Sequence, residues 1–334
     1  MIVISEVDRA DEPTLRAYWA VEQASQRHDR EHAMLRSWDR LQTLAQGGNE
    51  YYARTFLVAR DGDRVVGTAE TVRGLQDNLH LADLEVNVLP ERRREGIGRA
   101  LYDEAMGRLA ADGRTSVCGE VYVPGGDGPG TPAYDFAAGL GFEVVHREDH
   151  LMLGLPVPAQ DIDALRARAQ VDAEAYEILT WQERCPDEHV EAFAAMRTRM
   201  ENDVPIGEID YEPVVIDVER LRAGEERTSK SFQSITAAAR RLDDGEMGGY
   251  SLLYLPHGAD YIYQDDTLVM PEHRGHRLGT LLKCATLEIA QREHPERVAI
   301  HTDTAVDNHA MQATNRHFGY RPVERLLEMQ RRDG

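Results

Sequence analysis

The chain has 334 residues, of which 42 % are hydrophobic and 29 % charged, a composition typical of a soluble protein with two globular domains. Its formal net charge of −21 argues against nucleic-acid binding as the main task, because contacts to phosphates need a basic surface. An acidic surface favours cationic small molecules as ligands, or else merely keeps the protein in solution.

Membrane association and metal binding are also not indicated. No apolar stretch approaches the roughly 20 residues that span a bilayer, and the N-terminus lacks the layout of a signal peptide. Cys118, Cys185 and Cys284 are too few and too scattered for a disulfide framework or a zinc site. We therefore expect a cytoplasmic protein without a metal.

The first half of the chain predicts a mixed domain of strands and helices. Asp11 and Pro13 mark a helix start, Gly47 follows a helix end, and Asp61-Gly62 is a hairpin turn. In chain order we expect strand 2–7, helices 15–26 and 31–44, strands 55–60, 64–73 and 81–88, helix 97–111, strand 116–122, helix 132–139, and strands 142–146 and 150–155.

The second half predicts the same order of elements after a break at Pro156 and Pro158. We expect a connecting helix 161–169, strand 176–180, helix 187–200, loop 201–213, helix 215–226, strands 231–241, 248–255 and 261–270, a helix from Leu278, strand 297–302, helix 308–318 and strands within 320–329. The expected domains are 1–156 and 173–334, with a linker at 157–172.

One stretch occurs in both halves. Residues 88–101 align without a gap onto residues 269–282, and each reads as a strand end, a basic turn with glycine and a helix start. Free backbone N–H groups at such a helix start form a site for phosphate or pyrophosphate. Gly141-Phe142 and Gly319-Tyr320 recur at nearly the same spacing further on, so we infer a two-copy internal repeat.

The element order, the Val-x-Pro-x-x-Arg-x-x-Gly-x-Gly type turn and the late Gly-aromatic pair closely resemble the GNAT N-acetyltransferase superfamily. The resemblance covers nearly the whole chain twice, and the domain duplication is similar to that of mycothiol synthase. It implies an α/β fold (an α+β mixed sheet) made of two tandem GNAT acyl-CoA N-acyltransferase domains. It also implies acetyl-CoA as the acyl donor.

In that family the turn binds the pyrophosphate of acetyl-CoA, and the strand before it binds the pantetheine arm. By resemblance the cofactor residues of the first copy are Val88, Arg93, Arg94, Gly96, Ile97 and Gly98. Those of the second copy are Leu268, Val269, Arg274, Gly275, His276, Arg277, Leu278, Gly279, Thr280 and Asn308. Arg277 stands where the family has glycine, which puts a side chain in place of bare backbone. The alternative for both turns is an ordinary helix start with solvated arginines.

Amine acylation needs a base for the attacking amine and an acid for the departing thiolate. Family members often carry an acidic residue at the positions of Glu85 and Asp266, although each could also be a solvated carboxylate at a strand end. The tyrosine that usually serves as the acid is replaced by Ala137 in the first copy and by Asn315 in the second.

The two copies depart from the family pattern in different ways. The first copy has Gly130 where the second has Asn308, an asparagine that often contacts CoA in the family. We therefore expect the second copy to be catalytic, with Asp266, Asn315 and Asp265 as its catalytic residues. The first copy would be structural or a vestigial CoA site. His301, Thr302 and His309 are weaker candidates for proton transfer.

The loop 201–208 lies where the family lines its acceptor pocket, and its alternative is a solvated acidic loop. We expect Glu201, Asp203 and Tyr263 to bind the substrate. The predicted function is an acetyl-CoA-dependent N-acetyltransferase, a monomer or homodimer, in which the primary amine of a small molecule attacks the thioester directly. The alternatives are a different acyl-CoA or carrier-linked donor, and a non-catalytic CoA-binding protein.

Overall fold

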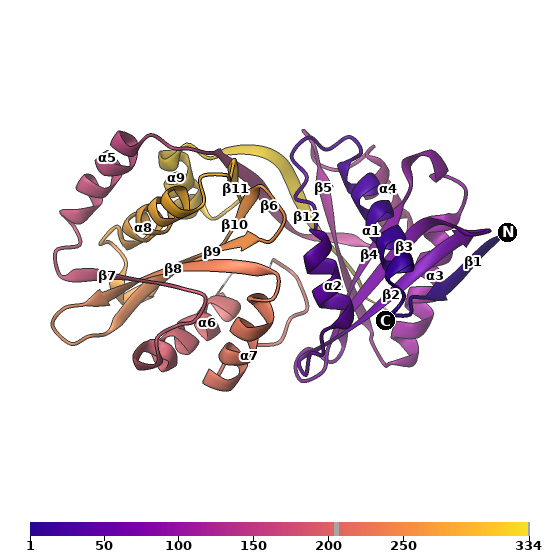
Figure 1. Ribbon diagram of the computed structural model, residues 1–334, viewed down its shortest axis with the longest axis horizontal. Coiled ribbons are helices and arrows are strands. Elements are labelled where there is room, and N and C mark those ends of the chain that lie inside the picture. Colours follow the sequence, from indigo (N-terminus) through magenta and orange to yellow (C-terminus); the bar gives the residue numbers. More distant parts are fainter. Residues whose placement is uncertain (204–206, 333–334) are drawn as a thin grey trace. The chain divides into compact units, whose positions relative to one another are not determined.

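The computed structural model describes residues 1–203 and 207–332, which divide into two compact units. The first unit contains residues 1–148, 207–212 and 324–332, and the second contains residues 149–203 and 213–323. Each unit has a mixed sheet with helices packed against it, as the sequence predicts (Figure 1). In the described part of the chain, no helix is both long and apolar enough to cross a membrane.

The sheet of the first unit has the strand order β1-β2-β3-β4-β5-β12-β6. Its strands are β1 (Ile2–Glu6), β2 (Tyr52–Asp61), β3 (Arg64–Gly74), β4 (Leu81–Val88), β5 (Ser116–Val123), β12 (Arg321–Arg332) and the first part of β6 (Glu143–Gly154). Its helices are α1 (Glu12–Arg27), α2 (Trp38–Gln46), α3 (Ile97–Ala111) and α4 (Pro132–Gly139).

The sheet of the second unit has the strand order β7-β8-β9-β10-β11-β6. Its strands are β7 (Tyr176–Gln182), β8 (Phe232–Arg241), β9 (Met247–Pro256), β10 (Tyr261–Val269), β11 (Ala299–Ala305) and the second part of β6. Its helices are α5 (Ala159–Gln170), α6 (Val190–Asp203), α7 (Val218–Thr228), α8 (Leu278–Glu293) and α9 (His309–Phe318). Figure 1 shows α8 and α9 on one face of this sheet and α6 and α7 on the other.

The hydrophobic core fixes the helix that follows each basic turn. Ile97 and Leu101 of α3 are buried in the core of the first unit, and Leu278 and Leu282 of α8 are buried in the second. Burial of each such side chain contributes about 1.5–3 kcal/mol, so the start of each helix is held at the end of the preceding strand.

Three predicted elements were wrong in detail. The strands expected at 142–146 and 150–155 are one strand, β6, and the helix expected at 31–44 is the shorter α2, because the Ser37 side chain accepts the Arg40 N–H and begins the helix there. The closing strand, β12, pairs with β5 of the first unit, where Leu327 and Met329 enter the core.

The compact units therefore do not follow the order of the sequence. The limits 1–156, 157–172 and 173–334 describe the sequence repeat and remain a prediction at that level. The units differ from them because β12, from the end of the chain, completes the sheet of the first unit. Cross-strand pairing over eight residues, from Arg325 opposite Val123 to Arg332 opposite Ser116, holds it there.

Candidate functional site

The two basic turns have the same backbone conformation. Arg94 and Gly96 have positive φ angles of 67° and 82° in the first turn, and Gly275 and Arg277 have φ of 90° and 53° at the aligned positions of the second. Each turn thus has two residues in the left-handed conformation. In the first turn the second of them is glycine (Gly96), and in the second turn the first of them is glycine (Gly275). The conformation costs a non-glycine residue about 1–2 kcal/mol, and each turn contains one such residue.

The side chain of Arg277, which stands where the family has glycine, is directed away from the start of α8. Its Nε atom lies 2.7 Å from Asp172 Oδ2, beyond the end of α5, and His276 Nδ1 lies 2.9 Å from the Asp172 carbonyl oxygen. The arginine side chain is directed to that carboxylate, and the backbone of the turn keeps the conformation that Gly96 has in the first copy. The second turn thus keeps the backbone conformation of the first turn.

We expect Gly275→Ala to destabilise the second unit by about 1–2 kcal/mol and to weaken binding of CoA, because alanine is strained at a φ of 90°. No heavy atom lies within 4 Å of the position of the added Cβ, so the effect is purely conformational. Thermal unfolding and calorimetric titration with CoA measure the two effects. The matched control is Arg277→Gly, which relieves strain and should preserve CoA affinity. A Gly275→Ala variant as stable as the parent would contradict the prediction.

The strand that leads into each basic turn, β4 in the first unit and β10 in the second, pairs with its parallel neighbour over only a short length. In the first unit it ends at Asp83 opposite Cys118, and in the second it ends at Tyr263 opposite His301. Both turn strands continue beyond that pair, to Val88 and Val269. In the second unit, β10 also has a bulge between Gln264 and Thr267 in its pairing with β9.

The bulge of β10 presents two adjacent carboxylates to one guanidinium. Arg197 Nη1, on α6, lies 3.1 Å from Asp265 Oδ2 and 2.7 Å from Asp266 Oδ2. The hydroxyl of Tyr250, on β9, is buried and donates a hydrogen bond of 2.7 Å to Asp266 Oδ2. Burial, followed by the neighbouring Asp266, raises the pKa of Asp265 to about 7. Two carboxylates thus share one arginine, and the pair can take up a proton near neutral pH.

The substrate residues predicted on the acidic loop lie in different places. Glu201 interacts with the carboxylate pair electrostatically: burial raises its pKa, and after burial Arg197, which lowers it, and Asp266, which raises it, have the largest effects. Asp203 instead forms an ion pair with Arg199 along α6. Tyr263 lies on β10, opposite Tyr254 of β9 and His301 of β11.

The later part of that loop belongs to the first unit, and the role of the loop in an acceptor pocket stays a prediction. Residues 204–206 lie outside the described part of the chain. Glu208 donates its N–H to the carbonyl of Val145, and Glu212 exchanges two hydrogen bonds with the side chain of Asn78. No local pattern indicates these contacts, because they depend on strands far away in the chain.

Asn315 of α9 and Asn308, the residue before that helix, both have structural partners. Asn315 is buried, and its Nδ2 donates to Thr304 Oγ1 at 3.1 Å, so its amide is directed to β11. None of its described contacts involves the carboxylate pair, which α6 faces from the opposite side of the sheet (Figure 1). Asn308 caps α9 by accepting the N–H of Met311. The catalytic prediction for Asn315 has no support from this geometry.

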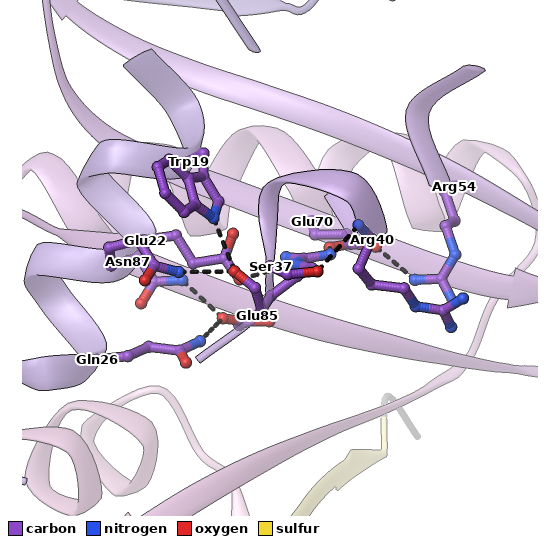
Figure 2. A network of polar contacts seen from close by, with 11 residues as sticks. Trp19, Glu22, Gln26, Ser37, Arg40, Arg54, Glu70, Glu85 and Asn87 are labelled. Carbon is purple, nitrogen blue, oxygen red and sulfur yellow. Dashed lines mark hydrogen bonds and ion pairs between the residues drawn. The ribbon is translucent and has the colours of Figure 1, made fainter. Parts of the chain in front are cut away.

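The first unit contains a polar network that the sequence reading missed (Figure 2). Arg36 donates to Glu22 and to Glu70 over 2.7 and 2.6 Å, and Arg54 also forms an ion pair with Glu70. Glu85, aligned with Asp266, accepts hydrogen bonds from Gln26 and Asn87. These charged residues lie far apart in the sequence and form no recognisable motif, so the network could be found only from the folded structure.

Carboxylates also gather on the strands beside Glu85. Glu120 of β5 lies directly opposite Glu328 of β12 in the antiparallel pairing. Limited hydration and then the charge of Glu328 raise the pKa of Glu120 to about 8. Burial and then the charge of Glu148 raise the pKa of Glu328 to about 7. Like charges at directly opposed positions are unfavourable, so this face of the sheet favours protons or cations.

These raised pKa values predict how stability depends on pH. Glu22 and Asp265 are further carboxyls whose pKa is raised to about 7, mainly by burial. Between about pH 5 and 7 the native state therefore binds more protons than the unfolded chain, so the free energy of unfolding should fall as the pH rises. Thermal unfolding at pH 5, 6 and 7 and constant ionic strength checks this. Glu328→Gln should flatten the trend, and a melting temperature that rises with pH would contradict it.

Comparison with known proteins identifies the family. A model described as an acetyltransferase (GNAT) domain matches residues 52–144, and one described as the acetyltransferase (GNAT) family matches residues 207–320. The chain belongs to the GNAT superfamily and has two GNAT domains in tandem, which confirms the predicted family and fold class. This is the fold of acyl-CoA-dependent acyltransferases. Among curated proteins, none matches this chain.

Solved structures resemble the whole chain. A tandem GNAT protein from the clavulanic acid biosynthesis pathway, without acetyl-CoA, is 25 % identical with a TM-score of 0.82, covering 100 % of this chain and 99 % of that one. A GCN5-related N-acetyltransferase from Sphaerobacter thermophilus is 15 % identical with a TM-score of 0.65, covering 99 % and 96 %. At 15 % identity, the similarity to the Sphaerobacter thermophilus protein supports only a shared fold.

Proposed function

We propose that this protein transfers an acetyl group from acetyl-CoA to the primary amine of a small molecule, and that the second copy does the chemistry. The observation that carries the proposal is the pair Asp265 and Asp266 on the bulge of β10, held by Arg197 and Tyr250 at the end of the strand that enters the basic turn. A proton acceptor and an anion-binding helix start thus lie on one strand–turn–helix element.

The residues of the second copy fit an acyl-CoA donor. The start of α8, with Gly275 and Arg277 in the left-handed conformation and the exposed Arg274 beside it, suits a pyrophosphate. When bound, acetyl-CoA supplies the acyl group as a thioester. Backbone N–H groups near Val269 would polarise the thioester carbonyl.

The carboxylate pair serves the acceptor. Arg197 donates to Asp266 at 2.7 Å and to Asp265 at the longer distance of 3.1 Å, and Tyr250 also donates to Asp266. Asp265, with its raised pKa, is therefore the member of the pair better able to take a proton near pH 7. The acceptor amine is protonated in water and must lose a proton before it attacks. The net charge of −21 supports a cationic acceptor.

A second candidate places the chemistry in the first copy. It is favoured by Glu85, which Gln26 and Asn87 hold by hydrogen bonds, and by a turn that matches the family pattern fully. In the leading proposal this copy is structural or a vestigial CoA site. A cytoplasmic location and a monomeric or homodimeric state remain predictions.

The proposal is tested by measuring CoA release with acetyl-CoA and a panel of primary amines, monoamines and polyamines included. Turnover that needs both acetyl-CoA and an amine supports it. A parallel series with longer acyl-CoA donors and a carrier-linked acyl group tests the alternative donors. Binding of CoA without turnover of any donor would favour a non-catalytic CoA-binding protein and overturn the proposal.

A further inference from the structure

A lysine is buried in the second unit without an acidic partner. Lys283 of α8 is 4 % exposed, and its Nζ atom lies 3.4 Å from Gln264 Oε1 and 5.1 Å from the centre of the Tyr320 ring. In residues 1–203 and 207–332, no carboxylate lies within ion-pair distance of it. Burial lowers the pKa of Lys283 to about 7. Such a residue weakens the fold, so a role other than stability is expected.

The partner of Lys283 is the residue that closes the bulge. A bulge interrupts the ladder of backbone hydrogen bonds between two strands. Here the side-chain amide of Gln264 compensates, because its Nε2 donates to the carbonyl oxygens of Leu252 and Asp266 at 2.8 and 2.9 Å. Gln264 is itself buried, and its backbone carbonyl accepts a hydrogen bond from Thr302 Oγ1 on β11.

The first copy supports the connection between these features. Its turn strand, β4, pairs with β3 in unbroken register from Ala82 to Val88 and has no bulge. Because the bulge adds one residue to β10, the strand pairings make Leu84 the counterpart of Gln264, and Tyr102 aligns with Lys283 beyond the bulge. The buried lysine and the glutamine thus occur in the copy whose strand is bulged, and neither occurs in the copy whose strand is regular.

We propose that Lys283 is a positioning residue for the carboxylate pair. It orients the amide of Gln264, Gln264 holds the bulge, and the bulge presents Asp265 and Asp266 to Arg197. The effect on turnover rests on the proposed function, whereas the effect on the bulge does not.

The test compares Lys283→Met with Thr286→Val, a matched control on α8. Thr286 is equally buried and bonds to the carbonyl of Lys283, but it has no described contact with Gln264. Methionine has a similar length and no charge to bury, so Lys283→Met should raise the melting temperature by a few degrees. Hydrogen exchange of the amides of residues 264–268 should become several-fold faster than in the parent, and the control should leave it unchanged.

The kinetic arm adds a second signature. Turnover of Lys283→Met should fall about tenfold with an unchanged KM for acetyl-CoA, because the carboxylates are misplaced while the turn is intact. Gln264→Leu should speed the same amide exchange. Unchanged exchange at the bulge, or a variant that is less stable or fails to fold, would overturn the proposal. If the parent protein turns over no amine at all, amide hydrogen exchange and the melting temperature still test whether Lys283 holds the bulge.

Discussion

Asp266→Asn is expected to lower turnover about 100-fold or more, with little change in the affinity for acetyl-CoA. The carboxylate accepts hydrogen bonds from Tyr250 and Arg197, and its charge raises the pKa of the neighbouring Asp265. Without that charge, Asp265 pairs with Arg197 alone and becomes a weaker base, and loss of base catalysis costs about 10²–10⁴ in rate. Steady-state kinetics of CoA release and calorimetric titration with acetyl-CoA measure the two effects.

The matched control is Glu85→Gln, the same change at the aligned position of the first copy. If the second copy does the chemistry, this variant should keep turnover within about twofold. The reversed result, a large loss in Glu85→Gln and normal turnover in Asp266→Asn, would assign catalysis to the first copy. Unchanged turnover in both variants would mean that neither carboxylate acts in the reaction.

Arg197→Met is expected to destabilise the second unit by about 3–5 kcal/mol, since removal of one partner leaves buried charge uncompensated. Arg197 forms ion pairs with both Asp265 and Asp266 and is itself largely buried. Trp181, whose ring packs against Phe193 in the second unit, reports this unfolding by fluorescence in a urea titration. The transition of the second unit should move to a lower urea concentration.

Arg199→Met is the control for this measurement. Arg199 lies one half-turn along α6 and forms an ion pair with Asp203 in which the two side chains are 47 % and 30 % exposed. Exposed pairs contribute about 0–1 kcal/mol, so this variant should unfold close to the parent. Asp265→Asn combined with Arg197→Met should recover part of the lost stability. Equal stability of Arg197→Met and the parent would show that the carboxylates are not held by this arginine.

The two basic turns show which structural features can be predicted from local sequence. Residues 81–88 and 97–111 form β4 and α3 with the predicted limits, because the hydrophobic pattern, Pro90 and the glycines define a strand, a turn and a helix within a short stretch. The repeat of that pattern near Pro271 predicted the second element of the same kind. Short-range signals of this sort also identified the family.

The sequence correctly predicted that Asp265 and Asp266 lie next to the turn, but not what surrounds them. Arg197 has the spacing of an ordinary helical residue, and Tyr250 lies on another strand; only folding brings both to the carboxylates. Lys283 stands in an apolar helix pattern that gives no sign of its contact with Gln264. Glu201 and Asp203 were grouped as one acidic loop, yet α6 continues through both and separates their partners.

By itself the sequence determined the two copies of the strand–turn–helix element, the family, and the carboxylates at the end of β10, because these depend on residues close together in the chain. The tertiary structure decided that the last strand, β12, completes the sheet of the first unit, and that a bulge aims Asp265 and Asp266 at Arg197. Strand pairing and ion pairs between distant segments depend on which surfaces meet on folding. No local pattern encodes that choice.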